Sequence, residues 1–144
     1  MRLFSILVFS LILAAGWEND FEEAKKHAEK EHKLILLNFS GSDWCVPCIQ
    51  FRKIVLDAAP FTTYATEHLV LVNADFPRLS KNQLTKENQK KNDKLADKYN
   101  PEGIFPYTLL LDADGKVLKT WEGFPRVSAE EFSGQIKEIA NARH

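Results

Sequence analysis

The chain has 144 residues, with 19 lysines and arginines against 20 aspartates and glutamates and a formal net charge of −1. This balance argues against nucleic acid or an anionic membrane as the main partner, because both select basic proteins. A chain of this length builds one domain with a hydrophobic core of its own.

The first 16 residues have the pattern of an export signal. Arg2 precedes a mainly apolar run over residues 3–13, and small residues follow at positions 14–16. The run is short for a bilayer-spanning helix and ends in residues suited to signal peptidase. We therefore predict a cleaved signal peptide over residues 1–16 and a periplasmic or secreted domain over residues 17–144, with no stable membrane association after cleavage. A retained N-terminal anchor is the alternative.

The next two segments predict a surface helix and a central strand. Asn19 or Asp20 can cap a helix that runs to about Glu31, with apolar residues on one face and charged residues opposite. Residues 34–39 are apolar at every position except Asn38, as expected for a strand covered by helices on both faces.

The only two cysteines, Cys45 and Cys48, stand at the start of a helical pattern that runs to about Asp57. One helical turn brings such a pair close enough to form a disulfide. The free N–H groups and the dipole at a helix start favour the thiolate of Cys45, whereas Cys48 lies inside the first turn and is expected to be more protected. We therefore predict a redox-active disulfide in which Cys45 attacks and Cys48 resolves.

Two other uses of the cysteine pair have weaker support. A structural bridge across one helical turn closes a loop too short to constrain the unfolded chain much. A single C-x-x-C motif supplies two zinc ligands, and the 4 histidines show no paired spacing near it. We expect neither a metal nor an organic cofactor.

A second apolar strand is predicted over residues 69–75, after a short helix over residues 62–67. Because a helical crossover joins the two strands, they should run parallel. Residues 76–91 are basic and polar with little apolar periodicity, so we interpret them as a solvated surface excursion rather than a partner site. Asn92 and Asp93 are then expected to cap a short helix that stops at Asn100 and Pro101.

The last third of the chain predicts a hairpin and a final helix. Strands over residues 107–111 and 116–121 flank a turn in which Gly115 supplies the positive φ that a tight hairpin needs. Ser128 and Glu131 form a capping box for the helix that follows.

Three separated features of the sequence resemble the thioredoxin family, specifically its secreted bacterial thioredoxin-like proteins. They are the stretch over residues 44–48, the stretch over residues 105–108 before an apolar strand, and the turn over residues 112–115. The resemblance covers roughly residues 20–142. It implies an α/β thioredoxin-like fold with a central mixed β-sheet flanked by helices on both faces. It also implies an enzyme, a thiol-disulfide oxidoreductase acting on disulfides of protein or peptide substrates and recharged by a membrane electron donor.

The resemblance assigns roles to the residues around the cysteines. Trp44 is expected to lie beside the disulfide and shape the docking surface. Pro106 is expected to be cis and to face the sulfurs, and Phe105 to offer its backbone to the substrate. Pro47 stiffens the loop between the sulfurs, and Val46 replaces the glycine usual in cytosolic thioredoxins.

Two family positions depart from the usual pattern. Thioredoxins commonly place a buried Asp and a Lys on neighbouring strands to help move a proton when the second cysteine is released. Aligned on the motifs, these positions are Asn38 and Leu71 here, and an Asn cannot take a proton. Water or Asp43 can substitute, and Asp43 is equally well interpreted as a helix-capping residue.

Two rival functions follow from the same residues. A redox-idle thioredoxin-like module would bind apolar peptides through Trp44 and Phe105, and a disulfide donor would run the exchange in the opposite direction. The lack of a histidine between the cysteines favours a reductant, because a positive neighbour there over-stabilises the thiolate and raises the potential.

Overall fold

The computed structural model describes residues 16–143. The predicted signal peptide over residues 1–16 therefore lies almost wholly outside the described residues. The described part forms a five-stranded sheet with the order β1-β3-β2-β4-β5. The strands are β1 (Trp17–Glu18), β2 (Leu34–Ser40), β3 (Leu69–Asp75), β4 (Tyr107–Leu111) and β5 (Val117–Glu122).

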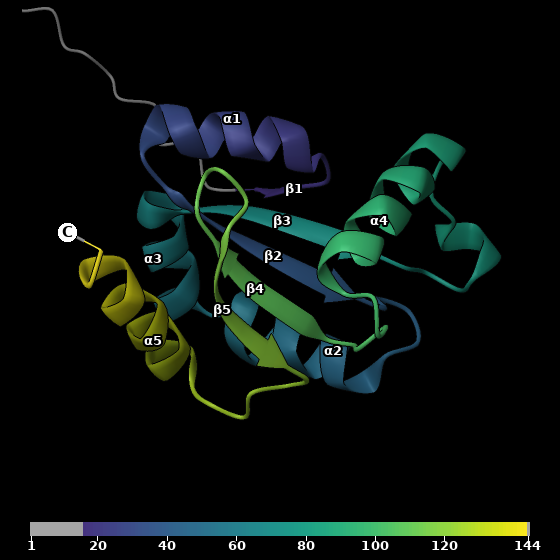
Figure 1. Cartoon of the computed structure of the whole chain (residues 1–144). Helices are drawn as coiled ribbons and strands as arrows, with labels where there is room; N and C mark the ends of the chain where they lie inside the picture. The colour runs from purple at the N-terminus through teal and green to yellow at the C-terminus, as the bar shows by residue number, and fades with distance from the viewer. Residues whose placement is uncertain (1–15, 144) are drawn as a thin grey trace, which may run out of the picture.

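Helical segments cover both faces of this sheet (Figure 1). They are α1 (Phe21–Glu31), α2 (Val46–Phe51), the π-helical η1 (Arg52–Leu56), α3 (Ala59–His68), the 3-10 turn η2 (Ser80–Asn82), α4 (Lys86–Tyr99) and α5 (Ala129–Asn141). β2 pairs in parallel with β3 and antiparallel with β4, so the sheet is mixed. This arrangement confirms the predicted thioredoxin-like α/β fold.

The central strand β2 is buried on both faces because its side chains alternate between two cores. Ile35, Leu37 and Phe39 pack under α1 and α4, whereas Leu36 packs with residues of α2, η1, α3 and α5. Each fully buried side chain of this size contributes about 1.5–3 kcal/mol to folding. These two cores hold β2 rigidly, and β2 carries the loop that leads to the cysteines.

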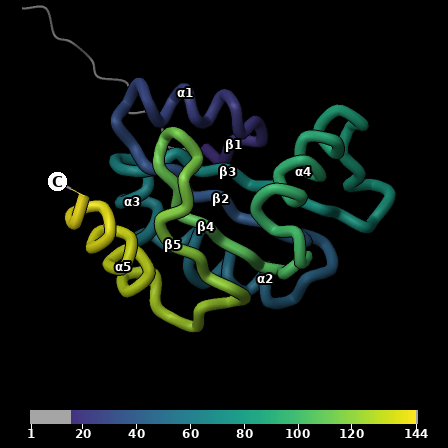
Figure 2. The backbone as a smooth tube through the Cα atoms, in the orientation of Figure 1, coloured from purple at the N-terminus to yellow at the C-terminus, as the bar shows by residue number. Residues whose placement is uncertain are grey.

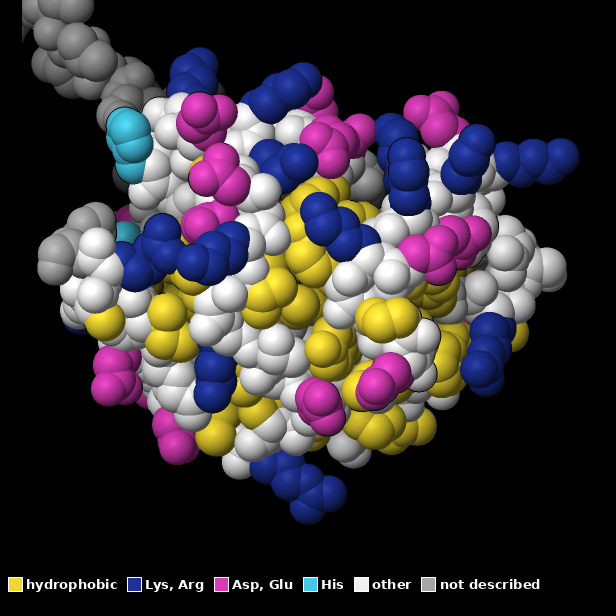
Figure 3. Space-filling view, viewed as in Figure 1, with side chains coloured by type: hydrophobic (Ala, Val, Ile, Leu, Met, Phe, Trp, Pro, Cys, Tyr) yellow, Lys and Arg dark blue, Asp and Glu magenta, His cyan; other side chains and the backbone are white. Residues whose placement is uncertain are grey.

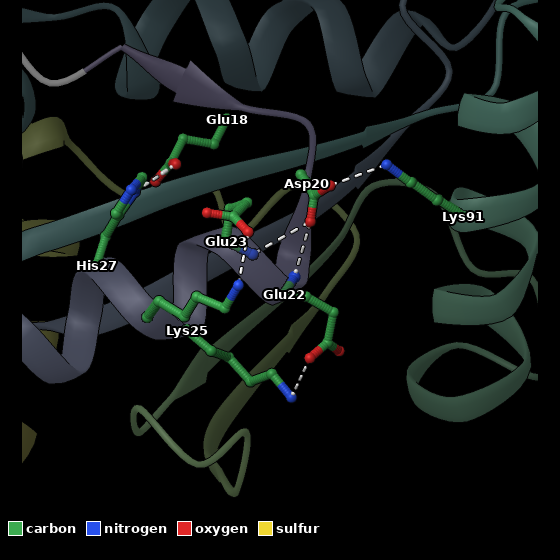
Figure 4. Close-up of polar contacts among 8 residues, drawn as sticks. Glu18, Asp20, Glu22, Glu23, Lys25, His27 and Lys91 are labelled. Carbon is green, nitrogen blue, oxygen red and sulfur yellow. Dashed lines mark hydrogen bonds and ion pairs between the residues drawn. The ribbon is translucent and has the colours of Figure 1, made fainter.

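The predicted cap of α1 is confirmed, and it also ties α1 to α4. The Asp20 carboxylate accepts the N–H groups of Glu22 and Glu23 at 3.1 Å each. Its other oxygen accepts from Lys91 Nζ at 2.9 Å (Figure 4). The Lys91 bond is the main cause that lowers the pKa of Asp20 from its ordinary value.

The helix α4 is longer than predicted. It begins at Lys86 rather than at Asn92, and Thr85 caps it by accepting the N–H of Asn88 at 3.2 Å. Asn92 is buried inside the helix, where its amide donates to the Asp75 carbonyl at 2.9 Å. The capping interpretation of Asn92 and Asp93 was therefore wrong, although the helix ends at Tyr99 as predicted.

Other boundaries also shift. The helix from the cysteines changes to a π-helical turn at Arg52–Leu56, and the short helix before β3 extends to Ala59–His68. The unpredicted strand β1 pairs in parallel with β3. None of these changes alters the sheet order around the cysteines.

The β4–β5 hairpin and the last helix follow the prediction. Gly115 has φ +88, and its carbonyl accepts the Tyr99 hydroxyl at 2.7 Å. Ser128 caps α5 by accepting the N–H of Glu131 at 3.1 Å. Within residues 16–143 no helix has the length and apolar character needed to span a membrane.

The segment between β3 and α4 returns to the loop over residues 41–45, which joins β2 to α2. Figure 2 shows this excursion beside the loop that joins β2 to α2. The two are joined by hydrogen bonds from Arg78 and Leu79 to Asp43. The excursion is therefore part of the surroundings of the cysteines.

Candidate active site

Cys45 and Cys48 form a disulfide at the start of α2, with their Cα atoms 5.2 Å apart. Cys45 is the N-cap residue of α2, and its Sγ accepts the backbone N–H of Cys48 at 3.3 Å. In the reduced protein the same N–H can stabilise a negative charge on the Cys45 sulfur. The start of α2 therefore favours a thiolate on Cys45.

Exposure does not separate the two cysteines. Cys45 is 5% exposed and Cys48 is 4% exposed, so the predicted extra protection of Cys48 is not seen at the level of whole residues. The side chain of Val46 between them is 62% exposed, and Pro47 is exposed as well. The asymmetry comes from hydrogen bonding at the N-cap rather than from burial.

Trp44 is held by contacts on several sides. Its indole Nε1 donates to the Phe76 carbonyl at 2.7 Å. Gly41 lies so close that an added Cβ would be 2.3 Å from the indole Cε2. The Arg78 guanidinium lies 3.7 Å from the centre of the ring, within cation–π range. The indole of Trp44 is therefore held in one position next to Cys45.

Phe105 packs into an aromatic cluster beside Trp44. Its ring meets Trp44 edge to face at 5.4 Å and Phe76 edge to face at 5.6 Å between centroids. The peptide bond between Phe105 and Pro106 is cis. The Pro106 carbonyl accepts the N–H of Gly123 at 2.8 Å, which joins this loop to the end of β5.

A groove of about 450 Å³ lies between α2, the loop that carries Phe105 and the segment that follows β5. It is lined by Pro47, Gln50, Phe105, Gly123, Phe124 and Arg126. Trp44 and Pro106 are not among the lining residues. Sequence reasoning missed Gln50 on α2, and it missed Gly123, Phe124 and Arg126 because it treated the segment after β5 only as the end of the sheet. The one local sequence signal for a turn at this point is the glycine at position 123, and in the structure Gly123 has a φ of +72.

Asp43 has a role that neither sequence interpretation anticipated. Its carboxylate accepts the N–H groups of Arg78 and Leu79 at 2.9 Å each and the Asn82 amide at 3.0 Å. The Arg78 bond is the main cause that lowers the pKa of Asp43 below its ordinary value. Asp43 does not cap α2, because Cys45 holds that position. It fastens the excursion after β3 to the active-site loop.

Asn38, the position that the resemblance aligns with the buried Asp of thioredoxins, has a polar neighbour on β3. Asn38 pairs in register with Asn73, whereas Leu71 pairs with Leu36 and belongs to the apolar core. The Asn38 amide donates to Asn73 Oδ1 at 3.3 Å, and Thr108 donates to Asn38 Oδ1 at 2.9 Å. This buried polar row contains no side chain that ionises at ordinary pH, so it cannot relay a proton by titrating.

Among residues 16–143, no group of three His, Cys, Asp or Glu side chains is placed to hold a metal ion. The chemistry that the described site offers is that of its sulfur pair. A cysteine pair at a helix start, carried by the central strand of a mixed sheet, defines a protein of thiol-disulfide exchange.

Comparison with known proteins gives the family. A family model described as a thioredoxin-like domain matches residues 21–140. The disulfide bond reductase DsbH of Chlamydia pneumoniae is 35% identical over 127 residues, which span 88% of this chain and 74% of that protein. This chain therefore belongs to the thioredoxin family, and it is a thiol-disulfide oxidoreductase.

Solved structures agree with this assignment. A structure described as DsbH oxidoreductase matches with a TM-score of 0.78 at 33% identity, covering 97% of this chain and 95% of that chain. A thioredoxin from Thermus thermophilus matches with a TM-score of 0.61 at 19% identity, covering 90% of this chain and 88% of that one. The second likeness supports the fold alone.

Proposed function

We propose that the chain reduces disulfides of exported protein or peptide clients, with Cys45 as the attacking thiol and Cys48 as the resolving thiol. The observation that carries this assignment is the bond from the Cys48 N–H to the Cys45 sulfur at 3.3 Å. A donor aimed at one sulfur favours the thiolate at that position. The reducing direction is supported by the name of the 35% identical relative, a disulfide bond reductase.

The reaction has two exchange steps. The Cys45 thiolate attacks one sulfur of the client disulfide, forming a mixed disulfide and releasing the other client sulfur as a thiolate, which takes a proton from solvent. Cys48 gives its proton to solvent, and its thiolate then attacks the Cys45 sulfur and releases the second client sulfur as a thiolate, which takes a proton from solvent. Two electrons have passed to the client, and the protein carries the Cys45–Cys48 disulfide.

Each cycle must be followed by reduction of that disulfide. The two electrons come from a second dithiol protein or a membrane electron carrier, which an exported protein needs because the cytosolic reductants are out of reach. The export signal expected over residues 1–16 supports a periplasmic or secreted location. No organic cofactor or metal takes part in either exchange step.

The groove beside Phe105 is the proposed place of the client. An extended segment can lie over Phe105 and Phe124 while its backbone pairs with that of Phe105. Trp44 and Pro106 act as fixed supports of Phe105 and its loop. The exposed side chain of Val46 offers a further apolar contact next to the attacking sulfur.

Trapping of the mixed disulfide tests the order of the two cysteines. Cys48→Ser leaves Cys45 without a resolving thiol, so a covalent adduct with a peptide disulfide should accumulate and be detected by mass spectrometry. Because the chain has 2 cysteines, the adduct reports on one site only. Cys45→Ser is the matched control and should form little adduct. Equal trapping by both variants, or trapping by Cys45→Ser alone, would reject the proposed order.

A redox-idle binding module predicts a different outcome. Such a protein would bind peptide equally well in the wild type and in Cys45→Ser, and neither form would exchange disulfides. Release of both client thiols by the reduced wild type, in proportion to the protein added, excludes that function.

A further inference from the structure

Arg78 lies over the active-site tryptophan. Its guanidinium carbon is 3.7 Å from the centre of the Trp44 ring. Arg78 is exposed and Trp44 is half-buried, so both reach the surface. The guanidinium therefore covers part of the indole there. A client that approaches the Trp44 side of the site therefore meets a planar cation as well as an aromatic ring.

The position of Arg78 is fixed by its backbone. Asp43 accepts the N–H groups of Arg78 and Leu79, and the Phe76 carbonyl accepts the indole N–H of Trp44. The chain is thus anchored to the active-site loop on both sides of Arg78. A guanidinium held in this way loses less freedom on pairing than one on a mobile loop.

Within the described residues 16–143, the Arg78 guanidinium has no carboxylate partner. Asp43 uses its oxygens on backbone N–H groups and on the Asn82 amide, and Asp75 uses its own on Ser42 and on the N–H of Phe76. None of the ion pairs among residues 16–143 includes Arg78. The charge is therefore available to a group supplied by another molecule.

Two exposed apolar side chains belong to the segments that carry Arg78 and Cys45. Leu79, the next residue, is 48% exposed, and Val46 beside Cys45 is 62% exposed. Figure 3 shows hydrophobic side chains gathered over α2 and over the loop that leads into β4, with basic and acidic groups among and around them. The surface fits a client segment that is mainly apolar and carries a charge close to its disulfide.

We propose that Arg78 determines client specificity by pairing with a carboxylate of a client residue adjacent to the disulfide, so that disulfides flanked by Asp or Glu react faster. The planar guanidinium, stacked on Trp44, presents its N–H groups at its edge, which suits a carboxylate. This inference rests on the proposed disulfide reduction and adds a preferred class of client to it.

Single-turnover kinetics test the preference. Reduced protein is mixed with peptide disulfides that differ in a single residue next to the cysteine. This residue is Glu, Gln or Lys, and it precedes the cysteine in one set of peptides and follows it in a second set. Each rate constant is divided by the rate of dithiothreitol with the same peptide, which removes the effect of the charge on the peptide's own reactivity. We expect a normalised preference for Glu over Lys of about two- to fivefold in at least one set, the scale of an exposed ion pair. The preference should shrink in 1 M salt, where screening acts within about 3 Å.

Three variants test whether Arg78 causes the preference for Glu over Lys. Arg78→Gln should abolish it, and Arg78→Lys should keep only part of it, because the charge is retained but the planar, stacked guanidinium is lost. Lys81→Gln is the matched control, since it removes one positive charge from the same excursion, and it should leave the preference unchanged. Thermal unfolding and the reduction potential of each variant check that fold and disulfide are intact.

The outcomes separate this inference from the proposed function. If Arg78 only supports Trp44, Arg78→Gln slows all three peptides by the same factor, which overturns the inference. Equal normalised rates for the three peptides with the wild type also overturn it, while leaving disulfide reduction in place. Failure of the wild type to react with any peptide rejects the proposed function, and the inference with it.

Discussion

Gly41 is predicted to be indispensable because it leaves room for Trp44. A Cβ added at Gly41 would lie 2.3 Å from the indole Cε2, 2.5 Å from Cζ2 and 2.6 Å from Nε1. Ordinary contact begins at 3.4 Å, so the indole must retreat by 3.4 − 2.3 = 1.1 Å. Gly41 does not have a positive φ, so the alanine adds no backbone strain and the whole effect is steric.

The cost of this retreat can be estimated from what holds the ring. Overpacking by one methyl group costs about 1–3 kcal/mol. Disturbing the 2.7 Å bond from Trp44 to the Phe76 carbonyl costs about 1 kcal/mol more. We therefore expect Gly41→Ala to lower the free energy of unfolding by about 2–4 kcal/mol and to slow disulfide exchange, because Trp44 adjoins Cys45.

Urea unfolding followed by far-UV circular dichroism measures the loss without relying on the fluorescence of Trp44. Gly134→Ala is the matched control, because that glycine lies in α5 with nothing within 4 Å of its added Cβ. It should stabilise the protein by about 0.5–1 kcal/mol through helix propensity. In a Trp44→Ala background the Gly41→Ala penalty should nearly vanish. A Gly41→Ala protein within about 0.5 kcal/mol of the wild type would refute the steric reasoning.

Three further predictions concern pH. The pKa of Asp43 is lowered in the folded state, so the stability that the Asp43 carboxylate contributes is present above about pH 4 and is lost as the pH falls through the folded value. Asp43→Asn should therefore lower the melting temperature at pH 7 and have less effect at pH 3. The pKa of Asp20 is also lowered in the folded state, so its pairing with Lys91 stabilises the protein at pH 7. Lys91→Met should therefore cost stability at pH 7, and this cost should shrink at pH 3 or in 0.5 M salt. A stability difference between variant and wild type that does not change with pH would mean that the ion pair is not its cause. Asn38→Asp places a carboxyl at a position that is 4% exposed, where burial raises its pKa above the unfolded value. The variant should therefore lose stability relative to the wild type as the pH rises from 4 to 8, by about 1.4 kcal/mol per unit of pKa elevation, in urea titrations at each pH.

Sequence patterns predict this fold well wherever the signal is local. Residues 69–75 are mainly apolar over a strand length, and the strand observed is Leu69–Asp75. Asp20 and Ser128 were recognised as caps because a short polar side chain preceded an amphipathic run. The cysteine pair was equally plain, since its members are three positions apart and a helix follows.

The failures arise where the signal is weak or not local. The first half of α4 is made of charged and amide residues, and its buried apolar residues, Leu95 and Tyr99, come in the second half, so apolar periodicity starts too late. The partner of Asn38 depends on the register of two strands that are distant in sequence, so its hydrogen bond to Asn73 could not be predicted from a local pattern. Arg78 carries no motif, and its place over Trp44 depends on how the excursion folds back onto Asp43.

The reduction potential of the Cys45–Cys48 pair tests the central claim most directly. The protein is equilibrated with glutathione buffers, and the thiols are then alkylated and counted by mass spectrometry. A reductase of exported clients should have a potential near that of thioredoxin, about −270 mV, and should transfer two electrons per molecule to a client disulfide. A potential near −120 mV, that of a strong disulfide donor, would contradict the proposed direction.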